Sequence, residues 1–253
     1  TARTDGGPMK SEAAERSKNL NETKPRLVNR SKELGLDHTF QVAAEEQGDG
    51  FAIYQALGGG VAVLDYDLDG NPDLYLAQGA ATPPKTMGIL GNQLFRNIVD
   101  QMIDTTQVAG GSDRQYTLGV SAGDWNQDGF EDLLVAEGRK PGFYGVPTDV
   151  SILRQIDGKL FDITDSIAPD LRNIGIVTDA RWIDVNKDSY KDIIVIGHYM
   201  EPKIFIYNDG RYISYSKNLN QFKGWWNTMD IYDVDQDGDE DVVLGNHGLN
   251  SRF

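Results

Sequence analysis

One nine-residue pattern occurs four times in the chain and places oxygen-bearing side chains at its positions 1, 3, 5 and 9. The copies span residues 65–73, 124–132, 184–192 and 233–241. So many carboxylates within nine residues repel one another unless a cation lies among them. A hard cation that takes six to eight oxygen ligands at about 2.3–2.6 Å fits this spacing, so the pattern predicts calcium.

The predicted ligands fall into two groups. The side-chain ligands are the Asp and Asn residues at positions 1, 3, 5 and 9: Asp65, Asp67, Asp69, Asp73, Asp124, Asn126, Asp128, Asp132, Asp184, Asn186, Asp188, Asp192, Asp233, Asp235, Asp237 and Asp241. Position 7 is expected to add a backbone carbonyl, from Asn71, Phe130, Tyr190 and Asp239. Position 6 is Gly in three copies, and we expect a positive φ there because the loop turns sharply.

The segments that flank each loop read as strands. An EF-hand would need Glu at position 12 and a helix after it, but position 12 here is Leu or Val. The loops are followed by the short apolar runs LYLA, LLVA, IIVI and VVLG, and preceded by alternating apolar residues. A single copy would be read as an acidic surface turn. Four copies between strands instead predict four hairpins whose turns hold calcium.

The spacing of the copies indicates a larger repeat. Successive loops begin 59, 60 and 49 residues apart, which suits a propeller blade of four strands. Further apolar segments, such as VSILRQ, KLFDIT, KIFIYN and RYISYS, resemble the outer two strands of the blades in a known family of repeats. The sequence therefore predicts an all-β fold.

These units resemble the FG-GAP/VCBS repeats of the integrin-α type of β-propeller, in which loops of the form DxDxDGxxD bind calcium. LGGGVAVLDYDLDGNPDLYLAQG, GNQLFRN and GWWNTMDIYDVDQDGDEDVVLGNHGLNSRF also resemble bacterial VCBS-repeat proteins related to cartilage acidic protein. The resemblance covers residues 26–253 and implies about four to five blades. We expect further chain segments or subunits to complete the propeller, and we interpret residues 1–25 as a polar arm or linker.

The composition indicates where the protein acts and which classes of partner it can bind. The net charge of −15 argues against nucleic acid, which requires a basic face, and four calcium ions would offset about half of it. There is no Cys, so disulfides and thiolate metal sites are excluded, and calcium would supply the cross-links. No run is long enough for a membrane span. We expect an exported bacterial protein, located in the periplasm, at the cell surface or outside the cell.

Two classes of function remain open. The first is a calcium-stabilised binding or adhesion module that recognises protein or glycan, and the second is the scaffold or accessory domain of a polysaccharide-active lyase or hydrolase. No catalytic motif is visible, and His38, His198 and His247 share no spacing that indicates a metal or catalytic role. This favours a binding module over an enzyme.

The sequence also predicts the relative strength of one calcium loop and the burial of two Trp residues. The third loop is expected to hold calcium most weakly, because it has Ser189 at position 6 and the cations Lys187 and Lys191 within it. Trp125 is expected near the surface, whereas Trp182 alternates with apolar neighbours and is expected in the core.

Overall fold

The computed structural model describes residues 26–41, 58–79, 90–140, 143, 145–215 and 219–247. The chain divides into two compact units, residues 1–31 and 32–253. In the first unit the described residues have no regular secondary structure, and the Asn29 side chain accepts a 3.0 Å hydrogen bond from the Ser31 N–H. The predicted arm at residues 1–25 lies outside the described residues.

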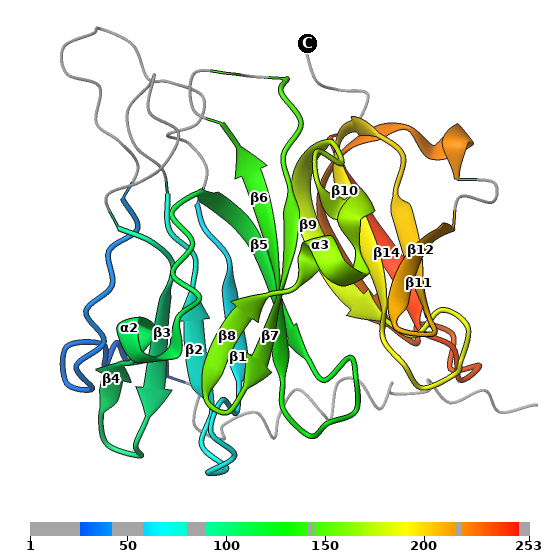
Figure 1. Cartoon of the computed structure of the whole chain (residues 1–253). Coiled ribbons are helices and arrows are strands. Elements are labelled where there is room, and N and C mark those ends of the chain that lie inside the picture. Colours follow the sequence, from blue (N-terminus) through cyan, green and yellow to red (C-terminus); the bar gives the residue numbers. More distant parts are fainter. Residues whose placement is uncertain are drawn as a thin grey trace, which may run out of the picture. The chain divides into compact units, whose positions relative to one another are not determined.

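The second unit is built from antiparallel β-sheets, coloured in chain order in Figure 1. The first four-stranded sheet has the order β1 (Val61–Leu64), β2 (Asp73–Leu76), β3 (Gln93–Asn97) and β4 (Met102–Asp104). The second has the order β5 (Tyr116–Gly123), β6 (Asp132–Arg139), β7 (Val150–Ile156) and β8 (Lys159–Asp162). Each sheet is a meander of sequential strands, as the predicted blade requires.

The third blade and the fourth hairpin share one six-stranded sheet. The blade comprises β9 (Ile176–Ile183), β10 (Asp192–Met200), β11 (Lys203–Asn208) and β12 (Arg211–Tyr215). The hairpin comprises β13 (Gly224–Tyr232) and β14 (Asp241–Asn246). The end of β10 pairs with the start of β13, His198 opposite Trp225 and Met200 opposite Gly224, so this backbone ladder links two neighbouring repeats.

Short helical turns connect the sheets. The described residues contain α2 (Thr106–Ala109), α3 (Thr164–Ile167), η2 (Pro169–Leu171) and η3 (Asn220–Phe222). None of the helices in this part of the chain is both long and apolar enough to cross a membrane. The fold in the described residues is therefore all-β, as the hydrophobic periodicity predicts, and its four-stranded units are those of propeller blades. That further protein completes a ring stays a prediction.

Apolar side chains fill the spaces between successive blades. One cluster joins the first two blades and includes Leu64, Tyr75, Val120 and Leu133. A second cluster joins blades two and three, and a smaller one joins β9 and β10 to β13 and β14. Because each blade buries its face against the next, burial of apolar surface between blades is a main source of stability.

The predicted burial of single residues is partly confirmed. Trp182 lies in the core as expected, but the prediction for Trp125 is wrong, because only 4% of this residue is exposed. Its side chain packs on Tyr207 and Tyr212 of the next blade, with ring centroids 5.1 and 5.9 Å away. Trp125, at position 2 of the second loop, therefore forms a contact between the second and third blades.

Candidate metal-binding loops

Each of the four acidic loops connects the first and second strands of a repeat, and all four share one set of local hydrogen bonds. The position-1 carboxylate accepts a bond from the N–H of position 6 at 2.9–3.0 Å: Asp65 from Gly70, Asp124 from Gly129, Asp184 from Ser189 and Asp233 from Gly238. The position-5 carboxylate accepts one from the N–H of position 7 at 2.8–3.1 Å. These bonds curl the backbone around the acidic side chains.

Two residues of every loop have a positive φ. At position 6 the angle lies between 73° and 91°, which confirms the expectation drawn from Gly and applies also to Ser189. Position 4 is left-handed as well, with φ between 58° and 64°, although it is never Gly: Leu68, Gln127, Lys187 and Gln236. Each such residue costs roughly 1–2 kcal/mol. The same strained backbone conformation recurs at position 4 of all four loops, and such strain is common at functional sites.

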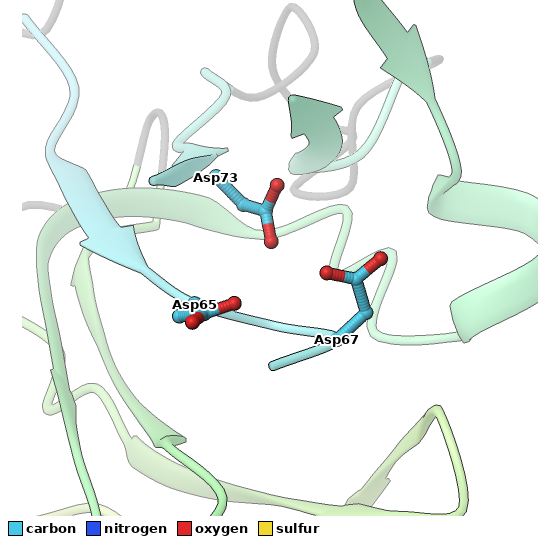
Figure 2. Close-up of side chains that lie close together, drawn as sticks. All are labelled: Asp65, Asp67 and Asp73. Carbon is cyan, nitrogen blue, oxygen red and sulfur yellow. The ribbon is translucent and has the colours of Figure 1, made fainter. Parts of the chain in front are cut away.

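The first loop brings three of its predicted ligands together. Carboxylate oxygens of Asp65, Asp67 and Asp73 lie within 4.8 Å of one another. Figure 2 shows the three side chains turned toward a common space, with Asp65 at the end of β1 and Asp73 at the start of β2. Oδ1 of Asp65 and Oδ1 of Asp67 are buried and have no hydrogen-bond partner among the described residues. Oxygens left in this state are suited to bind a cation.

The other three loops differ from the first in which side chains converge. In the fourth loop, Asp233, Asp235 and Asp237 converge within the same distance. The second and third loops have Asn126 and Asn186 at position 3, so each offers an amide oxygen in place of one carboxylate. These amide oxygens accept the N–H of position 5 at 2.9 and 3.0 Å, as Asp235 does at 3.2 Å. The loops therefore keep their shape with less negative charge.

The position-9 aspartates have a second, structural task. Asp73, Asp132 and Asp192 are fully buried, and one oxygen of each accepts a backbone N–H from the third strand of its blade, at 2.6–2.8 Å. The other oxygen of Asp73 and Asp192 accepts the N–H of position 2. In the second loop this second oxygen, Oδ2 of Asp132, has no partner among the described residues. Position 9 thus connects the loop to the outer part of the blade.

The electrostatics of these buried acids favour a cation. Burial, together with the charges of the neighbouring Asp128 and Asp124, raises the pKa of Asp132 to about 7. Burial and neighbouring loop carboxylates also raise the pKa of Asp73 and of Asp192. A divalent ion among these side chains would stabilise their charged forms. The all-oxygen ligand set, the buried unpartnered oxygens and the raised pKa values therefore fit calcium. The position-7 carbonyls stay predicted ligands.

Cationic side chains contact the loops, and sequence reasoning missed two of them. Arg96 of β3 forms ion pairs with Asp67 and Asp69, the second at 3.5 Å, and Arg154 of β7 pairs with Asp128 at 3.1 Å. Both arginines precede the residue whose N–H binds the position-9 aspartate, and the third blade has Ile206 at that place. A contact between strands of this kind has no signature in the spacing of the loops.

One of the two cations of the third loop, Lys187, contacts the fourth loop. Lys187 forms its ion pair with Asp239 of the fourth loop, not with the carboxylates of its own loop. Gln127 of the second loop likewise donates a 3.0 Å hydrogen bond to the backbone carbonyl of Ser189 in the third. Position 4 therefore reaches the next loop in both cases, and successive loops touch one another.

The structure also assembles polar residues that the sequence left apart. His38 contacts the Gln93 side chain at 2.6 Å. His198, however, contacts both Arg139 at 3.5 Å and Asn227 at 3.0 Å. The rings of Tyr199, Trp225 and His247 pack around this group. These residues come from three different repeats, so no spacing along the sequence relates them.

The comparisons with known proteins agree with this geometry. The family model described as "FG-GAP-like repeat" matches residues 65–135 and 184–244, together just over half of the chain. Each matched region begins at position 1 of a loop, and together they include all four loops. A search of the curated proteins gives no match. On the evidence of these repeats and of their four-stranded units, the chain belongs to the FG-GAP-like repeat proteins.

Proposed function

We propose that the chain is a calcium-stabilised binding module that acts outside the cytoplasm and recognises protein or glycan. The observation that carries the calcium part is the recurrence of one loop conformation in four repeats, with buried carboxylate oxygens left for a cation in the first two. FG-GAP repeat proteins are typically exported, and calcium is abundant outside cells, which supports the location.

Calcium would stabilise the folded state and would take no part in chemistry on a substrate. An ion held by positions 1, 3, 5 and 9 links the end of one strand to the start of the next. Through position 9 it also reaches the third strand, since the Asp132 carboxylate accepts the Gln155 N–H at 2.7 Å. Each ion would therefore stabilise three strands of a blade and neutralise carboxylates that otherwise repel one another.

The first experiment separates structural calcium from functional calcium. Asp128→Ala removes a position-5 ligand of the second loop and should lower the melting temperature in millimolar calcium. Ligand binding by the variant that remains folded should be nearly unchanged, because binding requires no chemistry at the ion. Loss of a measured turnover at full stability would contradict the proposal and indicate a catalytic metal.

One observation favours the second candidate, an enzyme or its accessory domain. His198, Arg139 and Tyr199 are titratable groups beside a cavity, which is the arrangement expected of a catalytic site. A general base, however, must present a free lone pair to the substrate. His198 donates through Nε2 to Asn227, and its Nδ1 faces the Arg139 guanidinium. The binding module therefore accounts better for this geometry.

The second experiment compares these two functions directly. The calcium-loaded protein is applied to a glycan array, and the glycans that bind are then tested for release of reducing sugar or of unsaturated product. Binding without release supports the binding module. Release that is lost in His198→Gln, with binding retained, would establish the enzyme in its place.

A further inference from the structure

Two contacts join the third and fourth acidic loops. Lys187, at position 4 of the third loop, forms an ion pair with Asp239, at position 7 of the fourth. Glu240, at position 8 of the fourth loop, accepts a 3.0 Å hydrogen bond from the backbone N–H of Asp184, at position 1 of the third. The structure describes every residue of both loops, so both partners of each contact are known.

Both contacts start from the part of the fourth loop that a calcium ion would hold. The backbone carbonyl of Asp239 is the predicted position-7 ligand, and the Asp241 side chain is the predicted position-9 ligand. Glu240 stands between these two residues. The N–H of Asp239 also donates to the Asp237 carboxylate at 2.9 Å. An ion in the fourth loop would therefore restrict the backbone from which the side chains of Asp239 and Glu240 reach the third loop.

In the third loop, the same contacts act on groups that a cation needs. Asp184 is a predicted ligand, and the hydrogen bond to Glu240 fixes the backbone from which its carboxylate extends. That carboxylate also accepts the Ser189 N–H at 3.0 Å. Lys187 is a cation within the third loop, and its ion pair with Asp239 occupies this charge with a carboxylate of the fourth loop. The Lys187 ammonium is thereby kept from competing with an ion for the third loop.

The other neighbouring loops have fewer of these links. Glu131 of the second loop accepts the Asp65 N–H of the first at 2.8 Å, so the position-8 bond recurs there. Between the second and third loops, the described contact is the 3.0 Å hydrogen bond from Gln127 to the Ser189 carbonyl. Among the contacts that the structure describes, an ion pair and a position-8 bond occur together between the third and fourth loops.

We propose that calcium in the fourth loop supports calcium in the third, so that the two loops bind the ion as a coupled pair. The inference rests on the proposed calcium binding and adds a dependence between two of its sites. The third loop has most to gain, because its position 6 is Ser189 with a φ of 73°. Coupling of this kind is reciprocal, since each site must change the affinity of the other by the same factor.

Electrostatic attraction alone would give an effect of the opposite sign. The fourth loop has six carboxylates and no cation. Without its own ion it would attract a cation to the neighbouring third loop more strongly. Two bound ions also repel each other, and salt at 0.15 M limits this repulsion to about 8 Å. At this ionic strength, the sign of the effect distinguishes the structural link from charge attraction.

The test removes the fourth site and follows the third by NMR. The N–H groups of Ser189 and Gly238 bind the position-1 carboxylates of the third and fourth loops, so their amide signals report the two loops separately in protein labelled at Ser and Gly. Asp235→Ala removes the position-3 ligand of the fourth loop. It should lower the calcium affinity reported by Ser189 about fivefold. Asp67→Ala is the matched change in the first loop and should leave that affinity unchanged.

Further variants test the link without removing a ligand. Glu240→Ala deletes the acceptor of the Asp184 N–H at an exposed position and should weaken calcium binding in the third loop several-fold. Glu240→Gln keeps an acceptor and should retain most of the affinity. Asp188→Ala, in the third loop, should lower the affinity reported by Gly238 by the same factor as Asp235→Ala lowers that of Ser189.

Two results would overturn the coupling, and a third would also reject the calcium sites. Equal or higher affinity at Ser189 in Asp235→Ala would exclude a supporting link, while calcium binding itself would stand. Equal losses in Glu240→Ala and Glu240→Gln would assign the effect to charge instead of the hydrogen bond. If neither the Ser189 nor the Gly238 signal responds to calcium in the native protein, the calcium part of the proposed function fails as well.

Discussion

The Glu131 carboxylate, at position 8 of the second loop, accepts a 2.8 Å hydrogen bond from the backbone N–H of Asp65, the first residue of the first loop. The same bond recurs between Glu240 of the fourth loop and the Asp184 N–H, at 3.0 Å. Position 8 of the third loop is Lys191, a residue without an acceptor, so the second loop does not receive this bond. The position-8 bond therefore links the first loop to the second and the third loop to the fourth.

Glu131→Ala should weaken calcium binding in a loop to which Glu131 does not belong. The variant removes an acceptor for the Asp65 N–H and a negative charge beside the first loop, so we expect a loss of about 1 kcal/mol of stability. Calcium affinity, followed by calorimetric titration, should fall several-fold at one site. Lys191→Ala is the matched change at position 8 of the third loop: it removes no such bond, so it should leave the calcium affinity of the second loop unchanged. Equal titration curves for Glu131→Ala and the native protein would refute the link.

Removal of calcium should lower the melting temperature substantially. Binding to the folded state alone contributes about 2.7 kcal/mol per site when free calcium is at a hundredfold excess over Kd. Circular dichroism melts in excess chelator and in millimolar calcium measure this difference. Identical melting curves would mean that the acidic loops are not metal sites.

The third loop should become more stable when Ser189 is replaced by Gly. Ser189 has a φ of 73°, which costs a residue with a side chain about 1 kcal/mol relative to Gly. Gly129→Ser is the reverse change in the second loop, where φ is 88° and an added Cβ meets no atom within 4 Å. Urea denaturation should therefore give shifts of opposite sign for the two variants. Shifts of the same sign would exclude backbone strain as the reason for a weak third loop.

Arg154→Ile should raise the calcium affinity of the second loop several-fold. The Arg154 guanidinium pairs with Asp128 at 3.1 Å and competes with an ion for that carboxylate. Loss of this partly exposed pair should cost the calcium-free protein no more than about 0.5 kcal/mol. Arg172→Gln is a control, since Arg172 pairs with Asp162 and Asp165 instead of a loop residue. An unchanged or lower affinity in Arg154→Ile would contradict the competition.

Glu137 should make the protein less stable as the pH rises from about 4.5 to about 7. Burial raises the pKa of Glu137 to about 7, above its value in the unfolded chain, so the folded state binds the extra proton across this interval. Glu137→Gln removes this effect, and its Oε1 still accepts the Asp149 N–H. The variant should be about 2 kcal/mol more stable than the native protein at pH 8 and equally stable at pH 4. A difference that does not change with pH would show that Glu137 is not protonated in the fold.

The loops and their flanking strands were predictable because the information is local. Ligands at positions 1, 3, 5 and 9 lie within nine residues, and the apolar alternation beside them is visible without any tertiary contact. KIFIYN, for example, coincides with β11 (Lys203–Asn208). The same local argument correctly places a positive φ at position 6. It fails at position 4, where Leu68 and Lys187 have no preference for the left-handed region.

Contacts between repeats were not predictable, because they depend on how blades pack. Arg96, Glu131 and Trp125 all act on a neighbouring strand or blade, and each would read from sequence as an ordinary surface residue or an isolated aromatic. Arg139 and His198 are separated by 59 residues, so their contact has no expression in spacing. Blade packing turns such separate residues into a site, and it explains why the sequence indicated calcium but no ligand cavity.

The pairing of β10 with β13 has a mechanical consequence. Trp225 and Gly224 begin the fourth hairpin, and they pair with His198 and Met200 of the third blade. A force applied along β13 would load this antiparallel ladder before it could peel the hairpin away. The third blade and the fourth hairpin should therefore open as one unit, with shared protection from hydrogen exchange, while the first two blades open separately.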